Sequence, residues 1–485
     1  MDAETLSRIQ FAGTVSFHFI YPPLSMGLGM MLVFIGIAYA RTKDPKWRQL
    51  AFFWTQIYGL IFAMGVATGI VQEFEFGMNW AAYSRFVGNV FGSLLAAEGV
   101  FAFFLEGGFL GLMLFGGSRL GPRMWLGATC VVVFAAHFSA LWIVMAHSWM
   151  QTPDGYKLVA DGGVQEAQMT NFLDVLFTPS FVSHILHVWA ASWTAGSALV
   201  LSVSVYYILR DRHLDLAKSA FKIAMPFFAV MAVTNLVFFG ANMAIEVTDN
   251  QPVKLAAMEG LFDDESCARL YIAGWVNESA QTTTGISIPC LLSFLAYQDF
   301  DATVQGLNSF PEDNWAPVNL TFQVYHYMFD LAMVFAALGV IAAGLYYWKE
   351  KLFRWRWLRW LLWVIVVLPV FTGTAIIAGW WTAEVGRQPW IVWEVMKTED
   401  GVSSNLTSTM MWASIGMFVV LYTLLFILFL YLLNARIHKG PQPLEELEAA
   451  PVETLPDTFR EIFLRRGARA SGAGELPPEG GEVAV

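Results

Sequence analysis

The chain has 485 residues, of which 56% are hydrophobic and 14% are charged, and it contains 20 Trp and 40 Phe. Soluble globular chains carry about 25% charged residues, so this composition excludes an ordinary soluble domain and indicates a polytopic membrane protein. The formal net charge of −11 argues against a nucleic-acid partner. The first residues, Met1 to Arg8, lack a basic stretch, so we expect no cleaved signal peptide.

Apolar runs long enough to cross a bilayer occur nine times. We expect these spans at 13–40, 51–72, 90–115, 124–147, 182–208, 219–242, 322–347, 358–382 and 408–434. The predicted fold class is therefore an all-α polytopic membrane protein with nine transmembrane helices. The expected organisation is helices one to six in 1–242, a polar external segment in 243–321, helices seven to nine in 322–439, and a disordered tail in 440–485.

Lysine and arginine determine the predicted orientation, because these residues are enriched on the cytoplasmic side of membrane proteins. With the N-terminus outside, seven basic residues face outward and the remaining 21 of 28 face the cytoplasm. The seven are Arg8, Arg85, Lys157, Lys254, Arg269, Arg387 and Lys397. This asymmetry predicts an outer N-terminus, a cytoplasmic C-terminus and an outer 243–321 segment.

Side chains that can ligate iron gather at the predicted outer ends of four spans. His18 lies a turn or two inside span one, His184 and His187 start span five, Met328 starts span seven, and Glu384 ends span eight. Imidazole, thioether and carboxylate groups form a haem-ligand set rather than a thiolate metal site. The sequence contains no Cys-x-x-Cys-His motif, so covalent c-type attachment of a haem is not expected.

Each of these residues also has a structural interpretation. A single membrane histidine is as often a hydrogen-bond partner between helices, and Met328 is one of 21 methionines that fill apolar cores. Glu384 and Arg387 lie just before Pro389, which stops the helix, so they also fit a salt-bridged helix end. The common depth of the candidate ligands favours cofactor binding.

Span three contains two acids, Glu98 and Glu106, which lie about 12 Å apart along a helix. Carboxyl groups inside a membrane commonly relay protons. Ser139 on span four is placed to extend such a relay toward the cytoplasm. The alternative is a protonated acid that holds neighbouring helices together.

In these residues the chain resembles subunit I of the cytochrome bd-type quinol oxidases, and most closely their cyanide-insensitive branch with a short Q loop. The resemblance covers roughly 1–435 and rests on the order of its motifs. These are Ser7–Phe11, Phe17–Phe19, Gly65–Gly69, Glu73–Gly77 with Asn79-Trp80, Glu98-Gly99, Phe103–Glu106, Ser139–Trp142, Lys254–Glu259 and Gly386–Trp390.

The resemblance implies a role for each candidate haem ligand. His187 and Met328 match the two axial ligands of the low-spin haem b558, whereas His184 does not align with a ligand. His18 and Glu384 match the axial ligands of two high-spin haems, b595 and haem d, with a further haem b as an alternative to haem d. The family often has an arginine two residues before the methionine, and His326 stands there in this chain.

The resemblance also assigns residues outside the ligand set. Trp380 matches a tryptophan packed between haems, and Glu98, Glu106 and Ser139 match the proton path. Arg387 and Trp390 belong to the Gly386–Trp390 motif and are expected to bind cofactor. Lys254 and Glu259 match the quinol-linked pair of the Q loop; a carboxylate can accept a hydroxyl proton and an ammonium can donate to a quinone oxygen. Cys267 and Cys290 lie in the same outer segment, where a disulfide between them is expected.

The implied function is that of the haem-bearing subunit of a terminal quinol oxidase in a bacterial inner membrane. Quinol, either ubiquinol or menaquinol, is oxidised at the outer face, and O2 is reduced to water with cytoplasmic protons, which generates a proton-motive force without pumping. The expected partners are a membrane-embedded subunit II and a small single-helix subunit. Two other functions remain open: a secondary transporter, which needs no haem, and an electron-transfer cytochrome, in which His18 and Glu384 have no role.

Overall fold

The computed structural model describes residues 1–99, 104–116, 120–161, 164–348 and 351–449. Among these residues, eight helical segments are long and apolar enough to cross a membrane. The predicted span 90–115 coincides with parts of two helices, and residues 100–103 between them lie outside the described part of the chain, as do residues 450–485 of the predicted tail.

The first half of the chain is helical apart from one hairpin. Its elements are α1 (Ala3–His18), α2 (Tyr21–Thr42), α3 (Pro45–Met78), α4 (Ala81–Glu98), α5 (Phe104–Phe115), α6 (Pro122–Gln151), β1 (Tyr156–Asp161), β2 (Val164–Met169), α7 (Phe172–Leu176), α8 (Phe181–Leu209), α9 (Leu214–Thr234), the π-helix η3 (Asn235–Phe239) and α10 (Gly240–Asn250). Helical structure therefore continues past the predicted end of span six at 242.

The second half starts with a segment of short elements and ends with three long helices. The short elements are α11 (Pro252–Glu259), β3 (Glu265–Ser266), β4 (Leu270–Asn277), β5 (Thr282–Ile288), α12 (Leu291–Tyr297), β6 (Thr303–Val304), η4 (Leu307–Ser309) and η5 (Glu312–Asn314). Next come α13 (Val318–Tyr347), α14 (Lys351–Arg354), η6 (Arg356–Leu358), α15 (Arg359–Val385), β7 (Trp390–Val392), β8 (Met396–Lys397), α16 (Thr398–Gly401), α17 (Ser408–Lys439) and α18 (Leu444–Ala449).

The first predicted span is divided into two helices. α1 ends at His18 and α2 begins at Tyr21, followed by Pro22 and Pro23. Proline has no backbone N–H to continue a helical ladder, so the two prolines can start a helix but not extend one. His18 therefore lies at a short break between two helices, although Ala3–Thr42 as a whole is one segment that is long and apolar enough to cross a membrane, so His18 still lies inside the first span.

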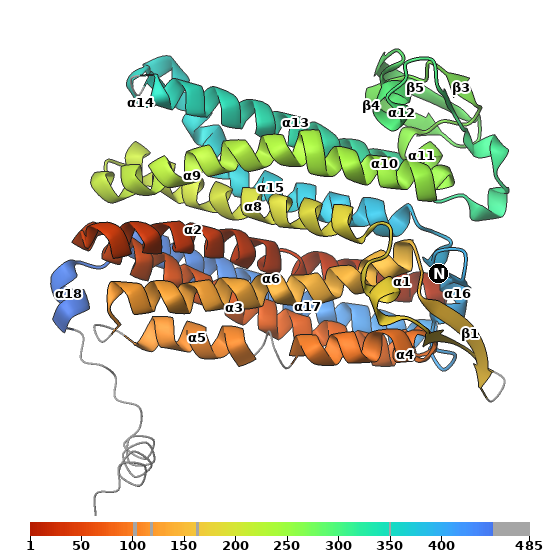
Figure 1. The fold of residues 1–485 in the computed structure, drawn as a ribbon, viewed down its shortest axis with the longest axis horizontal. Coiled ribbons are helices and arrows are strands. Elements are labelled where there is room, and N and C mark those ends of the chain that lie inside the picture. The colour runs from red at the N-terminus through yellow and green to blue at the C-terminus, as the bar shows by residue number, and fades with distance from the viewer. Residues whose placement is uncertain (100–103, 117–119, 162–163, 349–350, 450–485) are drawn as a thin grey trace, which may run out of the picture.

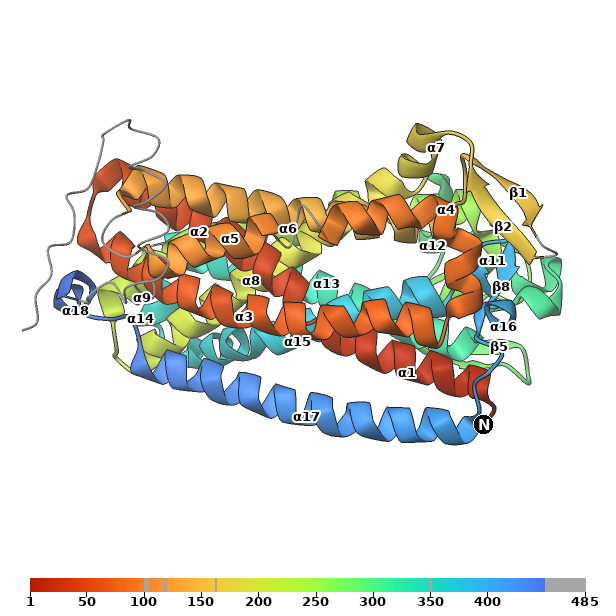
Figure 2. The ribbon, with the colours of Figure 1, turned by 90° about the horizontal axis from the view of Figure 1, so that it is seen from below.

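The long helices run side by side and form one bundle (Figure 1). The N-terminus lies at the same end of the bundle as β1, β4 and α11, whereas α14 and α18 lie at the opposite end. Figure 2 shows α17 along one side of the bundle, where it contacts α1 and α3.

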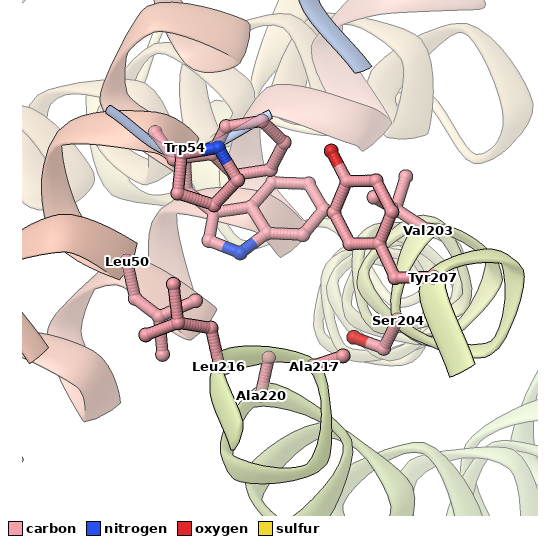
Figure 3. Close-up of a pocket in the computed structure, with 10 residues that line it drawn as sticks. Leu50, Trp54, Val203, Ser204, Tyr207, Leu216, Ala217 and Ala220 are labelled. Atoms are coloured by element: carbon pink, nitrogen blue, oxygen red, sulfur yellow. The ribbon is translucent and has the colours of Figure 1, made fainter. Parts of the chain in front are cut away.

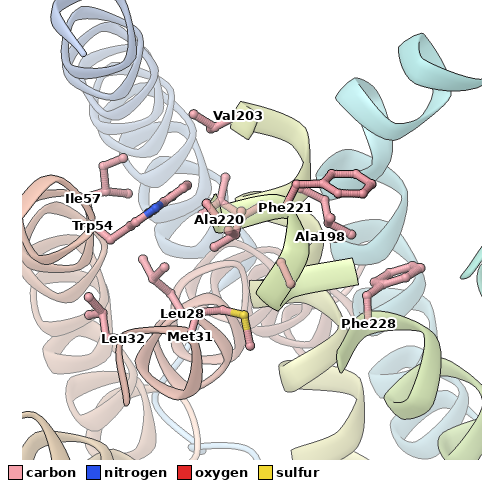
Figure 4. Close-up of a cluster of buried hydrophobic side chains, with 14 of the residues drawn as sticks. Leu28, Met31, Leu32, Trp54, Ile57, Ala198, Val203, Ala220, Phe221 and Phe228 are labelled. Atoms are coloured by element: carbon pink, nitrogen blue, oxygen red, sulfur yellow. The ribbon is translucent and has the colours of Figure 1, made fainter. Parts of the chain in front are cut away.

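The main apolar core lies where α2, α3, α8 and α9 meet. Leu28, Trp54 and Phe221 are each 1% exposed or less in this cluster (Figure 4). Gly27 on α2 and Gly196 on α8 pack backbone against backbone, so a Cβ on either glycine would overlap the other helix. A small hollow nearby is lined by Trp54, Tyr207 and neighbouring side chains (Figure 3), and its apolar walls carry no candidate ligand.

The segment between α10 and α13 is stabilised by a hairpin and a disulfide. β4 and β5 are antiparallel, with Leu270 opposite Ile288 and Asn277 opposite Thr282. Cys267 and Cys290 form a disulfide in the structure, which agrees with the hypothesis drawn from their common segment. The bond ties the start of the hairpin to the start of α12, so this segment is an ordered unit on top of the bundle.

Candidate functional site

His18 is oriented by a threonine on the neighbouring helix. Its Nδ1 lies 2.9 Å from Oγ1 of Thr68, and that hydroxyl donates its own hydrogen to the Met64 carbonyl at 2.8 Å. Thr68 therefore accepts a hydrogen from Nδ1, which makes Nε2 the ring's lone-pair nitrogen. A Cβ on Gly69 would lie 3.1 Å from the imidazole, so glycine keeps room for the ring.

His187 lies beside the π-helix η3. Its Nδ1 is buried and makes no hydrogen bond to a described residue, and the same is true of Oδ1 of Asn235. Gly240, at the end of η3, would place a Cβ 3.6 Å from the His187 ring. Short π-helical turns inside α-helices occur frequently at functional sites, and here the turn surrounds a histidine predicted to bind haem.

Met328 packs against Gly379 where α13 and α15 cross. A Cβ on Gly379 would lie 2.7 Å from Sδ of Met328, so a larger residue there would require the thioether to shift. Trp380 is the next residue of α15, and its ring centroid lies 6.2 Å from that of Phe11 on α1. These contacts bring α1, α13 and α15 together near the end of the bundle that holds the N-terminus.

Glu384 is the centre of a polar cluster at the end of α15. Its Oε1 lies 2.8 Å from Nε2 of His147, and its Oε2 accepts a hydrogen bond from Nη2 of Arg387 at 2.5 Å. Arg387 is 1% exposed and also donates from Nε to the Trp390 carbonyl at 3.3 Å, while its Nη1 makes no hydrogen bond to a described residue. A buried guanidinium with an unused donor suits a further anionic group.

His147 is a part of this cluster that the sequence did not reveal. It lies at the polar end of α6, and its ring centroid is 5.5 Å from that of His184. His184 in turn contacts the hydroxyl of Ser148 through Nδ1 at 2.9 Å. The run His147-Ser148 next to Gln151 and Thr152 was the available signal: four polar residues where span four ends.

The donor set fits haem rather than a bare metal ion. In the part of the chain that the structure describes, no group of three or more His, Cys, Asp or Glu residues is placed to hold a metal. The candidate ligands His18, His187, Met328 and Glu384 instead come singly from α1, α8, α13 and α15. Single axial ligands suffice for haem, because the porphyrin supplies the other four nitrogens.

The two acids of the predicted relay have different partners. Ser139 on α6 donates to Oε1 of Glu98 at 2.8 Å, while Tyr58 on α3 donates to Oε1 of Glu106 at 2.7 Å. Ser139 was predicted on the cytoplasmic side of both acids. The structure places it directly against Glu98, at the end of α4, so the predicted order of the three residues is wrong. Tyr58 is the residue next to Glu106 that the prediction missed.

Lys254 is buried, and its ammonium group is fully paired. Nζ donates to Oε1 of Gln151, to Oε1 of Gln251 and to the Ala383 carbonyl, each at 3.2 Å. Burial lowers the pKa of Lys254 to about 7, the charge of Arg387 acts in the same direction, and Glu384 opposes the shift. With three acceptors for three hydrogens, the group joins α11 to the ends of α6 and α15.

Glu259 lies at the other end of α11 and faces a different helix. It is 2% exposed, and neither carboxyl oxygen makes a hydrogen bond of standard geometry to a described residue, although the Tyr325 hydroxyl lies close to the carboxyl group. Burial raises its pKa to about 8, which the nearby Tyr325 hydroxyl partly opposes. Nε2 of His326 on α13 lies 3.8 Å from Oε2. Lys254 and Glu259 thus point to different sides of α11, and the structure does not bring them into contact.

Comparisons with known proteins agree on one family. The family described as Cytochrome bd terminal oxidase subunit I matches residues 6–441. The chain is 34% identical over 469 residues to the cytochrome bd ubiquinol oxidase subunit 1 of Bacillus subtilis (strain 168), covering 94% of this chain and 98% of the relative. It is 31% identical over 514 residues to the cytochrome bd-II ubiquinol oxidase subunit 1 of Escherichia coli (strain K12), covering 92% and 98%.

A solved structure shows the same fold. The bd oxidase from Geobacillus thermodenitrificans superposes with a TM-score of 0.82 at 28% sequence identity. The similarity covers 91% of this chain and 99% of the other. The family, the fold and the coverage of nearly whole relatives therefore agree.

Proposed function

Because the chain belongs to the cytochrome bd terminal oxidase subunit I family and is therefore a multi-pass component of a terminal respiratory oxidase, we propose that it is the subunit that oxidises quinol at the outer face and reduces O2. The observation that supports this best is the set of four single axial donors on four helices, each held by contacts that suit a ligand.

Membership of the family implies haem, and we assign the individual groups to residues. His187 and Met328 would hold haem b558, while His18 and Glu384 would hold the two high-spin groups, b595 and haem d or a further haem b. Bound haem supplies one-electron chemistry and an open iron position for O2. Thr68 fixes the His18 ring, and His147 and Arg387 fix the Glu384 carboxylate. Trp380 packs against Phe11 and follows Gly379, which contacts Met328, and Arg387 offers a spare donor to an anionic edge of a cofactor.

We place quinol at Glu259. A buried carboxyl group with unpaired oxygens can take a hydroxyl proton as the quinol is oxidised. A surface hollow lined by Gly260, Asp263, Asp264 and Tyr271 begins at the residue after Glu259, and we propose that it offers that proton a polar way out. Lys254 positions α11 against α15 through its hydrogen bond to the Ala383 carbonyl and against α6 through its hydrogen bond to Gln151, so it acts on the quinol site through the backbone.

Protons for O2 reduction come from the opposite side. Glu98 with Ser139, and Glu106 with Tyr58, form two hydrogen-bonded stations within the bundle. The basic residues concentrate at the end that holds α14 and α18, which supports a cytoplasmic assignment for that end and an outer one for α11. Protons released outside and taken up inside generate a proton-motive force across a bacterial inner membrane without pumping.

The partners follow from the family. A subunit I implies a subunit II, and a quinol is the expected reductant, either ubiquinol or menaquinol. We add O2 as the acceptor and a small single-helix subunit. Many long apolar side chains on α17 are exposed, among them Val419, Leu424 and Tyr431; a helix that is apolar all round suits lipid or a second membrane subunit.

Quinol-dependent O2 uptake by the purified complex tests this function. We expect uptake with a short-chain ubiquinol or menaquinol, and loss of uptake in both His18→Ala and Glu384→Ala. Haem reduction by quinol without O2 uptake in the unmodified complex would make the protein an electron-transfer cytochrome instead.

A further inference from the structure

Two buried polar atoms face each other at the quinol end of the bundle. Nε2 of His326 lies 3.8 Å from Oε2 of Glu259, and the two residues are 4% and 2% exposed. No described residue makes a hydrogen bond of standard geometry to either atom, although the Tyr325 hydroxyl lies near the Glu259 carboxyl group and the Tyr271 backbone lies near the His326 ring. Unpaired buried polar groups are rare in folded proteins and each requires an explanation. Here two such atoms face each other.

The His326 ring is held so that Nε2, and not Nδ1, faces the Glu259 carboxyl group. Its Nδ1 lies 2.9 Å from the Phe322 carbonyl oxygen, which can only accept, so Nδ1 carries a hydrogen. The ring stacks on Phe322 at 3.9 Å between centroids and meets Tyr325 edge-on at 5.1 Å. The imidazole therefore cannot rotate to find another partner without losing these contacts.

The backbone that carries the Glu259 carboxyl group is also fixed in place. Glu259 ends α11, and Gly260 follows in a left-handed conformation with φ of 61°. A Cβ on Gly260 would lie 2.7 Å from Oγ1 of Thr283, and that hydroxyl donates to the Gly260 carbonyl at 2.6 Å. The turn is thus fixed against the β4–β5 hairpin, which keeps Glu259 opposite His326.

Because Nδ1 carries the ring hydrogen, Nε2 of His326 is an acceptor that needs a donor, and it faces the Glu259 carboxyl group across 3.8 Å. A hydroxyl group matches that pair, because it accepts one hydrogen bond and donates another. A carbonyl oxygen can only accept, so it leaves one of the two buried atoms unpaired. Leaving a buried polar group unpaired is more costly than the hydrogen bond itself is favourable.

We propose that Glu259 and His326 bind one quinol hydroxyl between them, so that His326 is a second quinol-binding residue and the pair favours quinol over its quinone product. The inference rests on the proposed function, because it takes quinol as the substrate. Sites built around a hydroxyl reject analogues that lack it. The same discrimination promotes release of the oxidised product.

The position of His326 on α13 fits this role. It lies two residues before Met328, and successive α-helical residues are rotated by about 100°, so the two side chains leave the helix on nearly opposite faces. One face meets Glu259 and the other meets Gly379 on α15. His326 can therefore be changed without removing a proposed haem ligand.

The test uses three variants in the purified complex. His326→Leu removes the polar edge, and His326→Gln keeps a polar group near the position of Nε2. His438→Leu is the matched control, because His438 makes the same Nδ1 contact to the carbonyl four residues earlier, at 3.0 Å, but lies at the other end of the bundle on α17. The readouts are KM for decylubiquinol, the inhibition constant for decylubiquinone and the visible haem spectrum.

We expect His326→Leu to raise KM for the quinol about tenfold, the effect of one lost hydrogen bond to a buried group, with the quinone inhibition constant changed less than about threefold. His326→Gln should recover most of the loss, and His438→Leu should match the unmodified complex. The haem spectrum should be the same in all four proteins.

Three results would overturn the proposal: an unchanged KM in His326→Leu, an equal weakening of quinol and quinone, or an altered haem spectrum, which would place His326 in the haem site. Failure of the proposed function looks different, because the unmodified complex would then not oxidise quinol at all.

Discussion

Nζ of Lys254 lies 3.2 Å from the carbonyl oxygen of Ala383, the residue directly before Glu384. The same ammonium group bonds Gln151 at the end of α6, and Nε2 of Gln251 bonds the Gln151 carbonyl at 3.1 Å. The segment 243–321, which we assign to quinol, is thus fastened to the helix end that holds a candidate haem ligand. A substitution in α11 is therefore expected to alter the position of Glu384.

The two buried ionisable groups of α11 predict opposite dependences of stability on pH. Burial raises the pKa of Glu259 from 4.5 to about 8, so between these values the folded protein binds more protons than the unfolded chain, and the free energy of unfolding falls as pH rises. Burial lowers the pKa of Lys254 from 10.5 to about 7, so between these values the unfolded chain binds more protons and stability rises with pH.

Thermal melting separates the two groups, because only Glu259 contributes below about pH 7 and only Lys254 above about pH 8. Relative to the unmodified complex, Glu259→Gln should remove the falling limb and Lys254→Met the rising limb. Melting temperatures of both variants that run parallel to the unmodified protein at every pH would contradict the buried positions of these side chains.

Removing the Glu384 carboxylate should reduce haem binding and lower the stability of the folded protein. Glu384→Gln leaves Arg387 as a buried cation without its charged partner, a change that costs about 3–5 kcal/mol in comparable pairs. We expect a lower ratio of extracted haem to protein and a lower melting temperature. Adding Arg387→Gln should restore part of the stability but none of the haem; recovery of haem in the double variant would refute the assignment of Glu384 as a ligand.

Thr68 should affect haem binding only through its hydrogen bond with His18. Thr68→Val keeps the side-chain volume and removes the acceptor for Nδ1, and loss of such a partner weakens metal binding about 10–100-fold. Thr55→Val is the matched control, since Thr55 is equally buried on α3 and only bonds the Ala51 carbonyl. The measurement is haem content after dialysis against apomyoglobin. Equal retention in both variants would leave His18 without a role in haem binding.

Glu98→Gln should block O2 reduction while quinol still reduces haem, because the change removes a proton carrier and not an electron carrier. Ser139→Ala should slow turnover less, since it removes only the hydrogen bond to Glu98. Ser197→Ala is a suitable control, because that hydroxyl bonds only the backbone of its own helix. Stopped-flow spectra and O2 uptake distinguish the two steps; full turnover in Glu98→Gln would remove Glu98 from the path.

The features that could be predicted from sequence are those fixed by local chemistry. Hydropathy placed the spans to within a few residues in most cases, for example 182–208 against α8 at 181–209. The Cys267–Cys290 pairing was accessible because both residues lie in one outer segment. Pro22 and Pro23 indicate the helix break after His18. Hydropathy does not show this break, because the stretches on both sides of it are apolar.

What could not be predicted depends on how helices face one another. Lys254 and Glu259 are five residues apart, and only their contacts with α15 and α13 show that they serve different surfaces. The polar run that contains His147 marks the end of span four, but it does not identify the partner of His147, which is Glu384, 237 residues later in the chain. The partner of Ser139 likewise depends on the rotation of α4 and α6, which hydropathy does not determine.

The most direct test of the central claim is the reduced-minus-oxidised visible spectrum of the purified complex, combined with haem extraction and repeated in Met328→Leu. We predict haem b bands together with a far-red chlorin band or a further high-spin haem b, and selective loss of the low-spin haem b signal in the variant. A protein produced with haem available that binds none, or a variant with an unchanged spectrum, would contradict the assignment of these residues as haem ligands.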